Sequence, residues 1–192
     1  WLEAAGVVAG TVIHNEHGTV HSAAPDGHTY LITAGTFTGP THLTTPRLVA
    51  LVPNCSISLN STSNLTDLSL SGDVILSGGG TVNLTNLARI LGNGILTTDN
   101  LIRGDTNTGG SLGTNAIGII NQATGVIKAD VSGLVLDVDP NSANGLTHNG
   151  LMQAIGGGIL PLNGNGRGAF TNNHLIEALD HSHVHLLNGA VL

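Results

Sequence analysis

The sequence predicts an all-β protein, a right-handed parallel β-helix (β-solenoid) of roughly eight coils with about 24 residues in each. Three observations support this fold class. Apolar and polar residues alternate in short runs, which is the pattern of strands. Similar segments recur at a nearly constant spacing in the last third of the chain. Only 2% of the 192 residues are aromatic and 28 are glycine, which suits a narrow tube lined with small aliphatic side chains.

Residues 1–60 are predicted to form an N-terminal cap or irregular first coils, and residues 61–192 the regular coils. A cap is expected because a bare terminal coil is an open sheet edge. From residue 57 onward apolar residues occur in alternating pairs that we expect to point into the tube. These pairs are Ile57 and Leu59, Leu68 and Leu70, Val74 and Leu76, and Val82 and Leu84. The stretch 84–94 also fits a short helix that ends at glycine.

The repeat is clearest in three segments anchored at Gly125, Gly150 and His174, which are 25 and 24 residues apart. The matching residues two and four positions after the anchors are Ile127, Met152 and Ile176, and then Ala129, Ala154 and Ala178. Further on, Leu160 and Leu162 match Val184 and Leu186, and the first segment reaches its Leu134 and Leu136 one residue early. A weaker copy is anchored at Gly94.

Each period contains two short apolar runs, and Asn-Gly pairs separate many of them. Asn-Gly is a strong hairpin signal, so an antiparallel sandwich of short strands is the structural alternative. The recurrence at about 24 residues favours coils whose corners are formed by Asn and Gly in left-handed conformations.

Composition excludes some partners. Five Lys and Arg against 12 Asp and Glu give a net charge of −7, too few cations for binding nucleic acid phosphates. No apolar run approaches the roughly 18 residues of a membrane-spanning helix, so we expect no transmembrane segment. Cys55 is the only cysteine, which rules out a disulfide within the chain. The sequence points to no reaction, and we expect neither enzymatic activity nor a cofactor.

Several stretches resemble a known family. The segments "IINQATGVIKAD", "IRGDTNTGGSLGTNAIGIINQATG" and "LIEALDHSHVHLLNGAVL" are similar to the β-solenoid repeats of bacterial surface adhesins and autotransporters of the filamentous-haemagglutinin-like type. The resemblance covers about residues 70–192. It implies export, a right-handed parallel β-helix, and a role in adhesion or in extracellular structure, and it carries no catalytic residues with it.

The histidines form the main candidate metal site. His181, His183 and His185 stand at every second position of "DHSHVHLLNG", which on one strand would place three imidazoles on one face, suitable for Zn²⁺ or Cu²⁺. The repeat matches Val184 and Leu186 to inward residues, so the three histidines are expected to point outward. His14, His17 and His21 lie near the other end of the chain. If subunits stack head to tail, the two groups would meet at the junction.

Two further patterns carry chemistry. Asp99, Arg103 and Asp105 form a carboxylate cluster with one base, as in β-helix enzymes that cleave polysaccharides, although no aromatic sugar platform lies nearby. Four glycosylation sequons begin at Asn54, Asn60, Asn64 and Asn83, and they matter only where the source organism glycosylates its proteins.

Taken together, the sequence predicts a non-enzymatic structural protein located outside the cell or on its surface. It would form homopolymers, as filaments or a surface layer, by head-to-tail stacking or by donation of a terminal strand. The alternative is a carbohydrate-binding or adhesive module excised from a larger surface adhesin, with surface glycans as partners. The chain starts at Trp1, as expected of a processed or excised segment.

Overall fold

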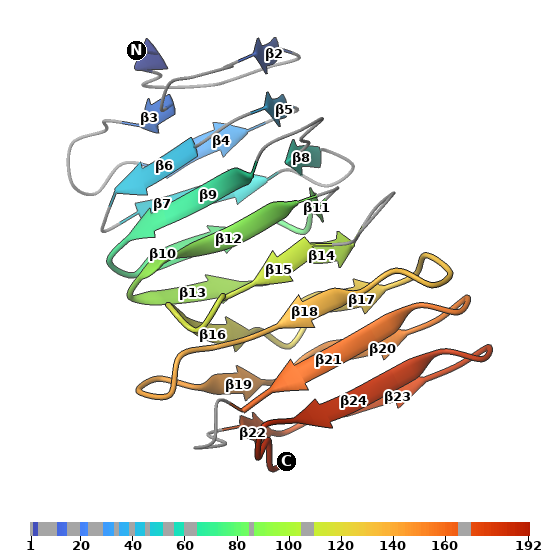
Figure 1. Cartoon of the computed structure of the whole chain (residues 1–192). Coiled ribbons are helices and arrows are strands. Elements are labelled where there is room, and N and C mark those ends of the chain that lie inside the picture. The colour runs from blue at the N-terminus through green and yellow to red at the C-terminus, as the bar shows by residue number, and fades with distance from the viewer. Residues whose placement is uncertain are drawn as a thin grey trace.

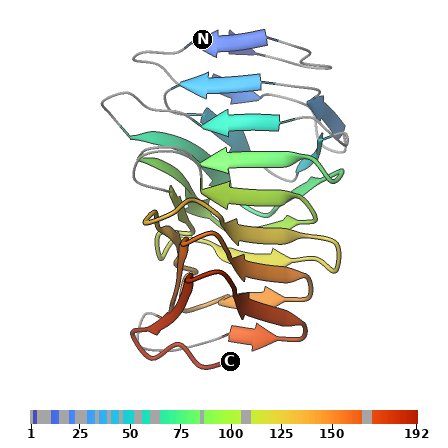
Figure 2. The same cartoon turned by 90° about the vertical axis from the view of Figure 1, so that its right-hand side faces the viewer.

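The computed structural model describes residues 2–3, 11–14, 20–22, 29–32, 35–38, 41–44, 47–51, 56–59, 65–84, 87–104, 110–164 and 170–192. Over these residues the chain is a right-handed parallel β-helix, which confirms the predicted fold class. Figure 1 shows the coils stacked from the N-terminal end to the C-terminal end, and Figure 2 shows the same stack turned by 90°. The described residues contain no helix, and therefore none that could span a membrane.

The described strands form three parallel sheets, named A, B and C, which run along the stack. In spatial order, sheet A contains β1 (Leu2–Glu3), β3 (Val20–Ser22), β6 (Thr41–Thr44), β9 (Thr66–Ser71), β12 (Ala88–Asn93), β15 (Gly110–Leu112), β18 (Leu136–Val138), β21 (Ile159–Asn163) and β24 (His183–Leu187). Sheet B contains β4 (Thr29–Ile32), β7 (Arg47–Leu51), β10 (Val74–Ser77), β13 (Ile95–Thr98), β16 (Gly118–Asn121), β19 (Leu146–His148) and β22 (Phe170–Asn172). Sheet C contains β2 (Thr11–His14), β5 (Gly35–Thr38), β8 (Ser56–Leu59), β11 (Thr81–Leu84), β14 (Leu101–Gly104), β17 (Val126–Ala129), β20 (Leu151–Ala154) and β23 (Leu175–Ala178).

Backbone register sets the length of each coil. In sheet C the paired residues Leu101, Val126, Leu151 and Leu175 follow one another at 25, 25 and 24 residues. Corners lengthen or shorten other coils, and in sheet B the advance from Ile119 to its partner in β19 is 27 residues. Every pairing between described strands is parallel, which excludes the antiparallel sandwich for this part of the chain.

The repeat anchored at Gly125, Gly150 and His174 is confirmed, because the apolar residues two positions after these anchors pair with one another in register. The placement of Leu134 and Leu136 is wrong. Val138, not Leu136, pairs with Leu162. The corner from Ala129 to Val135 is one residue longer than the matching corner from Ala154 to Ile159, and this extra residue shifts the inward pair to Leu136 and Val138.

Two other assignments are also wrong. Gly94 precedes β13 of sheet B, whereas Gly125 precedes β17 of sheet C, so Gly94 does not anchor a copy of this repeat. The residue equivalent to Gly125 in the preceding coil is Asn100, directly before β14. The helix alternative over 84–94 is excluded because residues 88–93 form β12. A full coil has three strands, one more than the two apolar runs indicated.

Alternate side chains point into the tube and stack in columns from coil to coil. One column in sheet C contains Ile57, Val82, Ile102, Ile127 and Met152, each at most 3% exposed. All four apolar pairs predicted to point inward between residues 57 and 84 are buried. Burial of this kind contributes roughly 1.5–3 kcal/mol for each large aliphatic side chain, so these columns are the main source of stability.

Adjacent coils approach so closely that some strand positions accept only glycine. Gly92 lies inside β12 with a φ of +131°, and a Cβ atom there would overlap the backbone of Leu70 in the coil above. An L-residue would be strained in this conformation even without the overlap. The glycine content therefore reflects close backbone contact between coils as well as turns.

The strands before residue 60 belong to the same three sheets as the strands that follow. β3 and β6 pair with each other, and β6 pairs with β9, so sheet A continues across the predicted boundary (Figure 1). The division into residues 1–60 and 61–192 stays a prediction.

Replacing Ile102 by Ala should lower the free energy of unfolding by about 2–5 kcal/mol, because a cavity would remain in the column. Ile75 is the matched control: it lies on the outward side of β10 and is 48% exposed. Ile75→Ala should cost less than about 1 kcal/mol. Urea unfolding followed by circular dichroism measures both values, and equal losses would contradict the assignment of inward and outward positions.

Candidate functional site

The C-terminal end of the stack is an open coil end. Among the described strands, β22, β23 and β24 stand last in sheets B, C and A, and each has a neighbour on one side only. Their outer edges present backbone N–H and C=O groups that no further described strand pairs. Such an edge is a template for another strand. Figures 1 and 2 both show these three strands together at the C-terminal end of the stack.

The apolar interior is exposed at this end. Leu186 pairs with Leu162 in the preceding coil and shares its inward position, yet Leu186 is 50% exposed whereas Leu162 is fully buried. Val184 is half-buried, while its partner Leu160 is fully buried. Other large apolar side chains exposed in the last coil and the tail are Leu175, Leu179, Leu187, Val191 and Leu192. An apolar surface that ends a sheet stack in this way favours association.

The last residues leave this surface uncovered. The chain turns at Asn188 and Gly189, and Ala190 N–H donates to the carbonyl oxygen of Leu187. The Asn188 side chain donates to Asn163 Oδ1 of the preceding coil, at 2.8 Å. The tail therefore folds back along the stack, and Val191 remains 66% exposed.

The histidines of the last coil do not all share one strand face. His183 and His185 lie on the outward side of β24, opposite Ile159 and Pro161, as predicted. His181 precedes the strand, in a turn where it and Asp180 have positive φ angles of 60° and 51°. The expected single face of three imidazoles is therefore wrong for His181. Within the described residues, no three His, Cys, Asp or Glu side chains lie close enough together to hold one metal ion.

The N-terminal histidines predicted at the same junction fall on different sheets. His21 lies in β3 of sheet A, the sheet that ends with β24, whereas His14 lies in β2 of sheet C. His17 lies outside the described residues. Of the three, His21 alone shares a described sheet with His183 and His185.

A buried polar column at the corner that follows sheet B escaped the sequence analysis. Thr98, Asn121 and His148 pair in register from coil to coil, and all three are fully buried. The Asn121 side-chain amide donates to His148 Nδ1 at 3.1 Å, so Nε2 carries the proton and donates to the carbonyl oxygen of Leu175 at 3.0 Å. His148 thus ties β16, β19 and β23 together. The one sequence signal was the position of these residues just before the repeat anchors.

Both nitrogens of His148 are used only when the ring is neutral. A proton on Nδ1 would face the donating amide of Asn121, whose Oδ1 atom is buried without a hydrogen bond. Burial lowers the pKa of His148 most, the hydrogen bond to Leu175 opposes this, and the charge of His174 lowers the pKa further. The folded state therefore disfavours the imidazolium.

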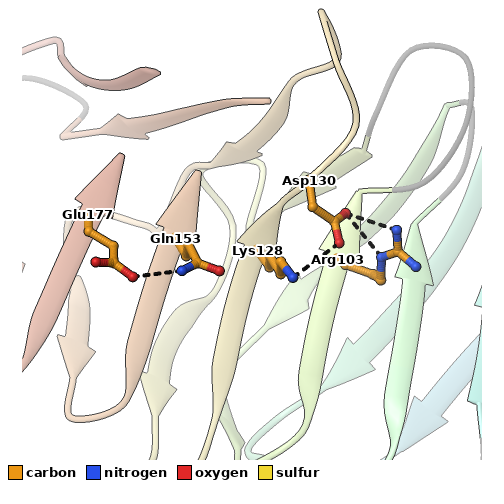
Figure 3. A network of polar contacts seen from close by, with 5 residues as sticks. All are labelled: Arg103, Lys128, Asp130, Gln153 and Glu177. Atoms are coloured by element: carbon orange, nitrogen blue, oxygen red, sulfur yellow. Dashed lines mark hydrogen bonds and ion pairs between the residues drawn. The ribbon is translucent and has the colours of Figure 1, made fainter. Parts of the chain in front are cut away.

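The outward face of sheet C carries a column of polar side chains, shown in Figure 3. Arg103 Nη2 lies 2.9 Å from Asp130 Oδ1, and Lys128 Nζ lies 3.5 Å from Asp130 Oδ2. One strand further, the Gln153 amide donates to Glu177 at 2.6 Å. These contacts link neighbouring coils along the stack, and each exposed pair of this kind contributes at most about 1 kcal/mol.

The predicted carboxylate cluster is distributed differently in the structure. Arg103 pairs with Asp130, 27 residues away, rather than with Asp99. Asp99 Oδ1 accepts a hydrogen bond from Gly78 N–H at 2.8 Å. Asp105 lies outside the described residues. The described members of the cluster thus hold adjacent coils together, and this arrangement gives no support to a catalytic role for Asp99 or Arg103.

One sequon asparagine is described. Asn83 lies on β11, where its side-chain amide donates to Ser58 Oγ at 3.3 Å. Its Oδ1 atom is buried and has no hydrogen bond. Asn54, Asn60 and Asn64 lie outside the described residues, as does Cys55.

Comparison of the chain with protein-family models, with curated proteins and with solved structures gives no match.

Acid should destabilise the protein through His148. Its folded pKa lies below the unfolded value of about 6.5, so the stabilising contribution is present above that value and is lost as the pH falls below it. The unfolding free energy of the parent should therefore fall between pH 7 and pH 5 more steeply than that of His148→Gln, whose neutral amide can still accept from Asn121 and donate to Leu175.

The difference between the two slopes should not exceed about 1.4 kcal/mol per pH unit, the limit for one proton. Urea unfolding at several pH values measures it. The exposed His183 provides the control His183→Gln, which should keep the parent slope. A His148→Gln slope equal to that of the parent would show that His148 is not protonated on unfolding in this range.

Proposed function

We propose that the chain is a non-enzymatic structural subunit that assembles head to tail, with the last coil of one copy receiving the first coil of the next. The observation that carries this proposal is the open C-terminal coil, whose apolar inward positions and strand edges are uncovered. A contact between two different ends of a subunit repeats without closing when the ends lie along one axis. Such a contact produces a filament.

The first described strands of the sheets are suited to continue the stack. Leu2 of β1 pairs with Val20, Val20 pairs with Thr41, and Thr41 pairs with the buried Leu68. Backbone register therefore assigns Leu2 to an inward column of sheet A. In a head-to-tail contact, β1 of the next copy would extend sheet A beyond β24 and place Leu2 in the inward layer beside Leu186.

The lateral surface supports a location outside the cell or on its surface, in filaments or in a surface layer. Charged residues make up only 9% of the chain, and the ion pairs of sheet C hold neighbouring coils together. The similarity of its repeats to those of bacterial surface adhesins and autotransporters, noted from the sequence, supports the same proposal.

A carbohydrate-binding or adhesive module is the second candidate. It rests on the outer face of sheet C, where the column of Arg103, Lys128 and Gln153 runs beside half-exposed aliphatic residues, Leu101 and Leu151 among them. A strip with polar groups on one side and apolar groups on the other suits sugar rings. Binding of the monomeric chain to a glycan array would favour this candidate over assembly.

Replacing Leu186 by Lys should prevent assembly, because the contact would lose an apolar side chain and bury a charge. Loss of one leucine from the interface is worth roughly 1.5–3 kcal/mol, so the concentration at which half the protein assembles should rise at least tenfold. Ile75→Lys is the matched control, since Ile75 is equally exposed but lies on the side of the stack. Sedimentation velocity and negative-stain electron microscopy measure both variants.

The parent should form rods of increasing length as its concentration rises, and Ile75→Lys should behave like the parent. A parent that remains monomeric at all concentrations, or Leu186→Lys rods equal to those of the parent, would overturn the proposal.

A further inference from the structure

Two imidazoles stand together on the outward side of the last strand. His183 and His185 of β24 are both exposed, and their ring centroids lie 5.6 Å apart with the rings inclined by 39°. A histidine nitrogen binds Zn²⁺ at about 2.0–2.1 Å, so two rings that share one tetrahedral ion have centroids roughly 5 Å apart. The spacing of this pair therefore matches two ligands of one ion. Side chains two apart on a strand hold this spacing because they share a face.

The same coil does not supply a third ligand. His181 lies in the preceding turn, and the neighbours of the pair in β21 are Ile159 and Pro161, which have no donor atoms for a metal. Within the described residues the pair belongs to no group of three metal-binding side chains. The remaining ligands must therefore come from water or from a second molecule that covers the edge of β24.

Backbone register identifies the residue that a second copy would bring to this edge. Ser69 of β9 stands between the buried Leu68 and Leu70, so its position is outward. Ser69 pairs with His42, His42 with His21, and His21 with Glu3 of β1. Register alone therefore assigns Glu3 to the outward face of sheet A, the face that carries His183 and His185.

In a head-to-tail contact, β1 of the next copy becomes the neighbour of β24 at the strand spacing of about 4.8 Å. Glu3 would then stand beside the histidine pair. Two imidazoles and one carboxylate with an open fourth position are an established zinc ligand set. His21 lies one strand further, in the same outward column.

We propose that His183 and His185 form one half of a divalent transition-metal site at the junction between stacked copies, and that Glu3 of the next copy completes it. This inference rests on the proposed head-to-tail assembly. The ion would strengthen the junction, since a group that binds only the assembled state stabilises that state. The metal is of the Zn²⁺ class, because imidazole and carboxylate together suit Zn²⁺ better than Ca²⁺ or Mg²⁺.

The test titrates the purified chain with ZnCl₂ and follows binding by calorimetry and assembly by sedimentation velocity. Zinc should lower the concentration at which half the parent assembles, and EDTA should reverse the effect. The double variant H183A/H185A should lose more than about tenfold in zinc affinity, since even the outer-shell partners of a metal ligand contribute about 10–100-fold. It should also lose the response of assembly to zinc.

Two controls separate the parts of the inference. H174A/H181A removes two exposed histidines of the same coil that lie off the outward face of β24, and it should bind zinc like the parent. E3Q should retain binding of zinc to the histidine pair but lose the response of assembly. Circular dichroism checks the fold of each variant, and both replaced histidines of the pair are exposed, so no core contact is removed.

The outcomes distinguish this inference from the proposed function. If rods form equally well with zinc and with EDTA, the assembly proposal stands and the metal site is overturned. If H183A/H185A binds zinc like the parent, the assignment of these histidines is overturned. If zinc binds to the pair but E3Q responds like the parent, the assignment of Glu3 is overturned. Failure of assembly itself is detected separately, by the comparison of the parent with Leu186→Lys.

Discussion

The structure depends on stacking between equivalent side chains of successive coils. A coil of about 24 residues cannot enclose its own core, because each inward side chain is covered by the coil above and the coil below. Leu162 is fully buried only because it lies between the coils of Val138 and Leu186. Leu186 has the same inward position but a neighbour on one side, and half of its surface is exposed. Stability is therefore shared between neighbours, and an end coil is incomplete by construction.

Corners must satisfy a different requirement, because the backbone turns inside the stack where water cannot reach it. Asn100 meets it with its own side chain, which donates to the carbonyl oxygen of Leu76 and accepts from Gly80 N–H. His148 does the same for Asn121 and Leu175 two coils further on. Polar side chains at this corner thus replace hydrogen bonds that strands supply elsewhere. They also make the coil that contains His148 sensitive to acid, whereas the aliphatic columns are indifferent to it.

The sequence predicted what depends on alternation and failed where a single corner residue decides. Inward positions such as Ile127 and Met152 follow from a period of two and from one recurring spacing, and both survive small errors. The register of Leu136 could not be predicted, because one added residue in a corner exchanges inward and outward positions. His181 was misplaced for a related reason: a non-glycine residue with positive φ is uncommon, and composition alone does not mark it. The partner of Arg103 was missed since Asp130 lies one whole coil away.

The sides and the end of the stack differ in how far their groups are already satisfied, and this difference points to assembly. On the side formed by sheet C, Arg103 and Lys128 are paired with Asp130, and Gln153 with Glu177, so these polar groups bind their neighbours in the stack. At the C-terminal end, three strand edges and the inward side of the last coil have no described neighbour. A coil is the only element whose shape offers three parallel strands and an apolar centre together. The surface that most requires a partner therefore also specifies the partner's fold, and the first coil of the same chain meets that description.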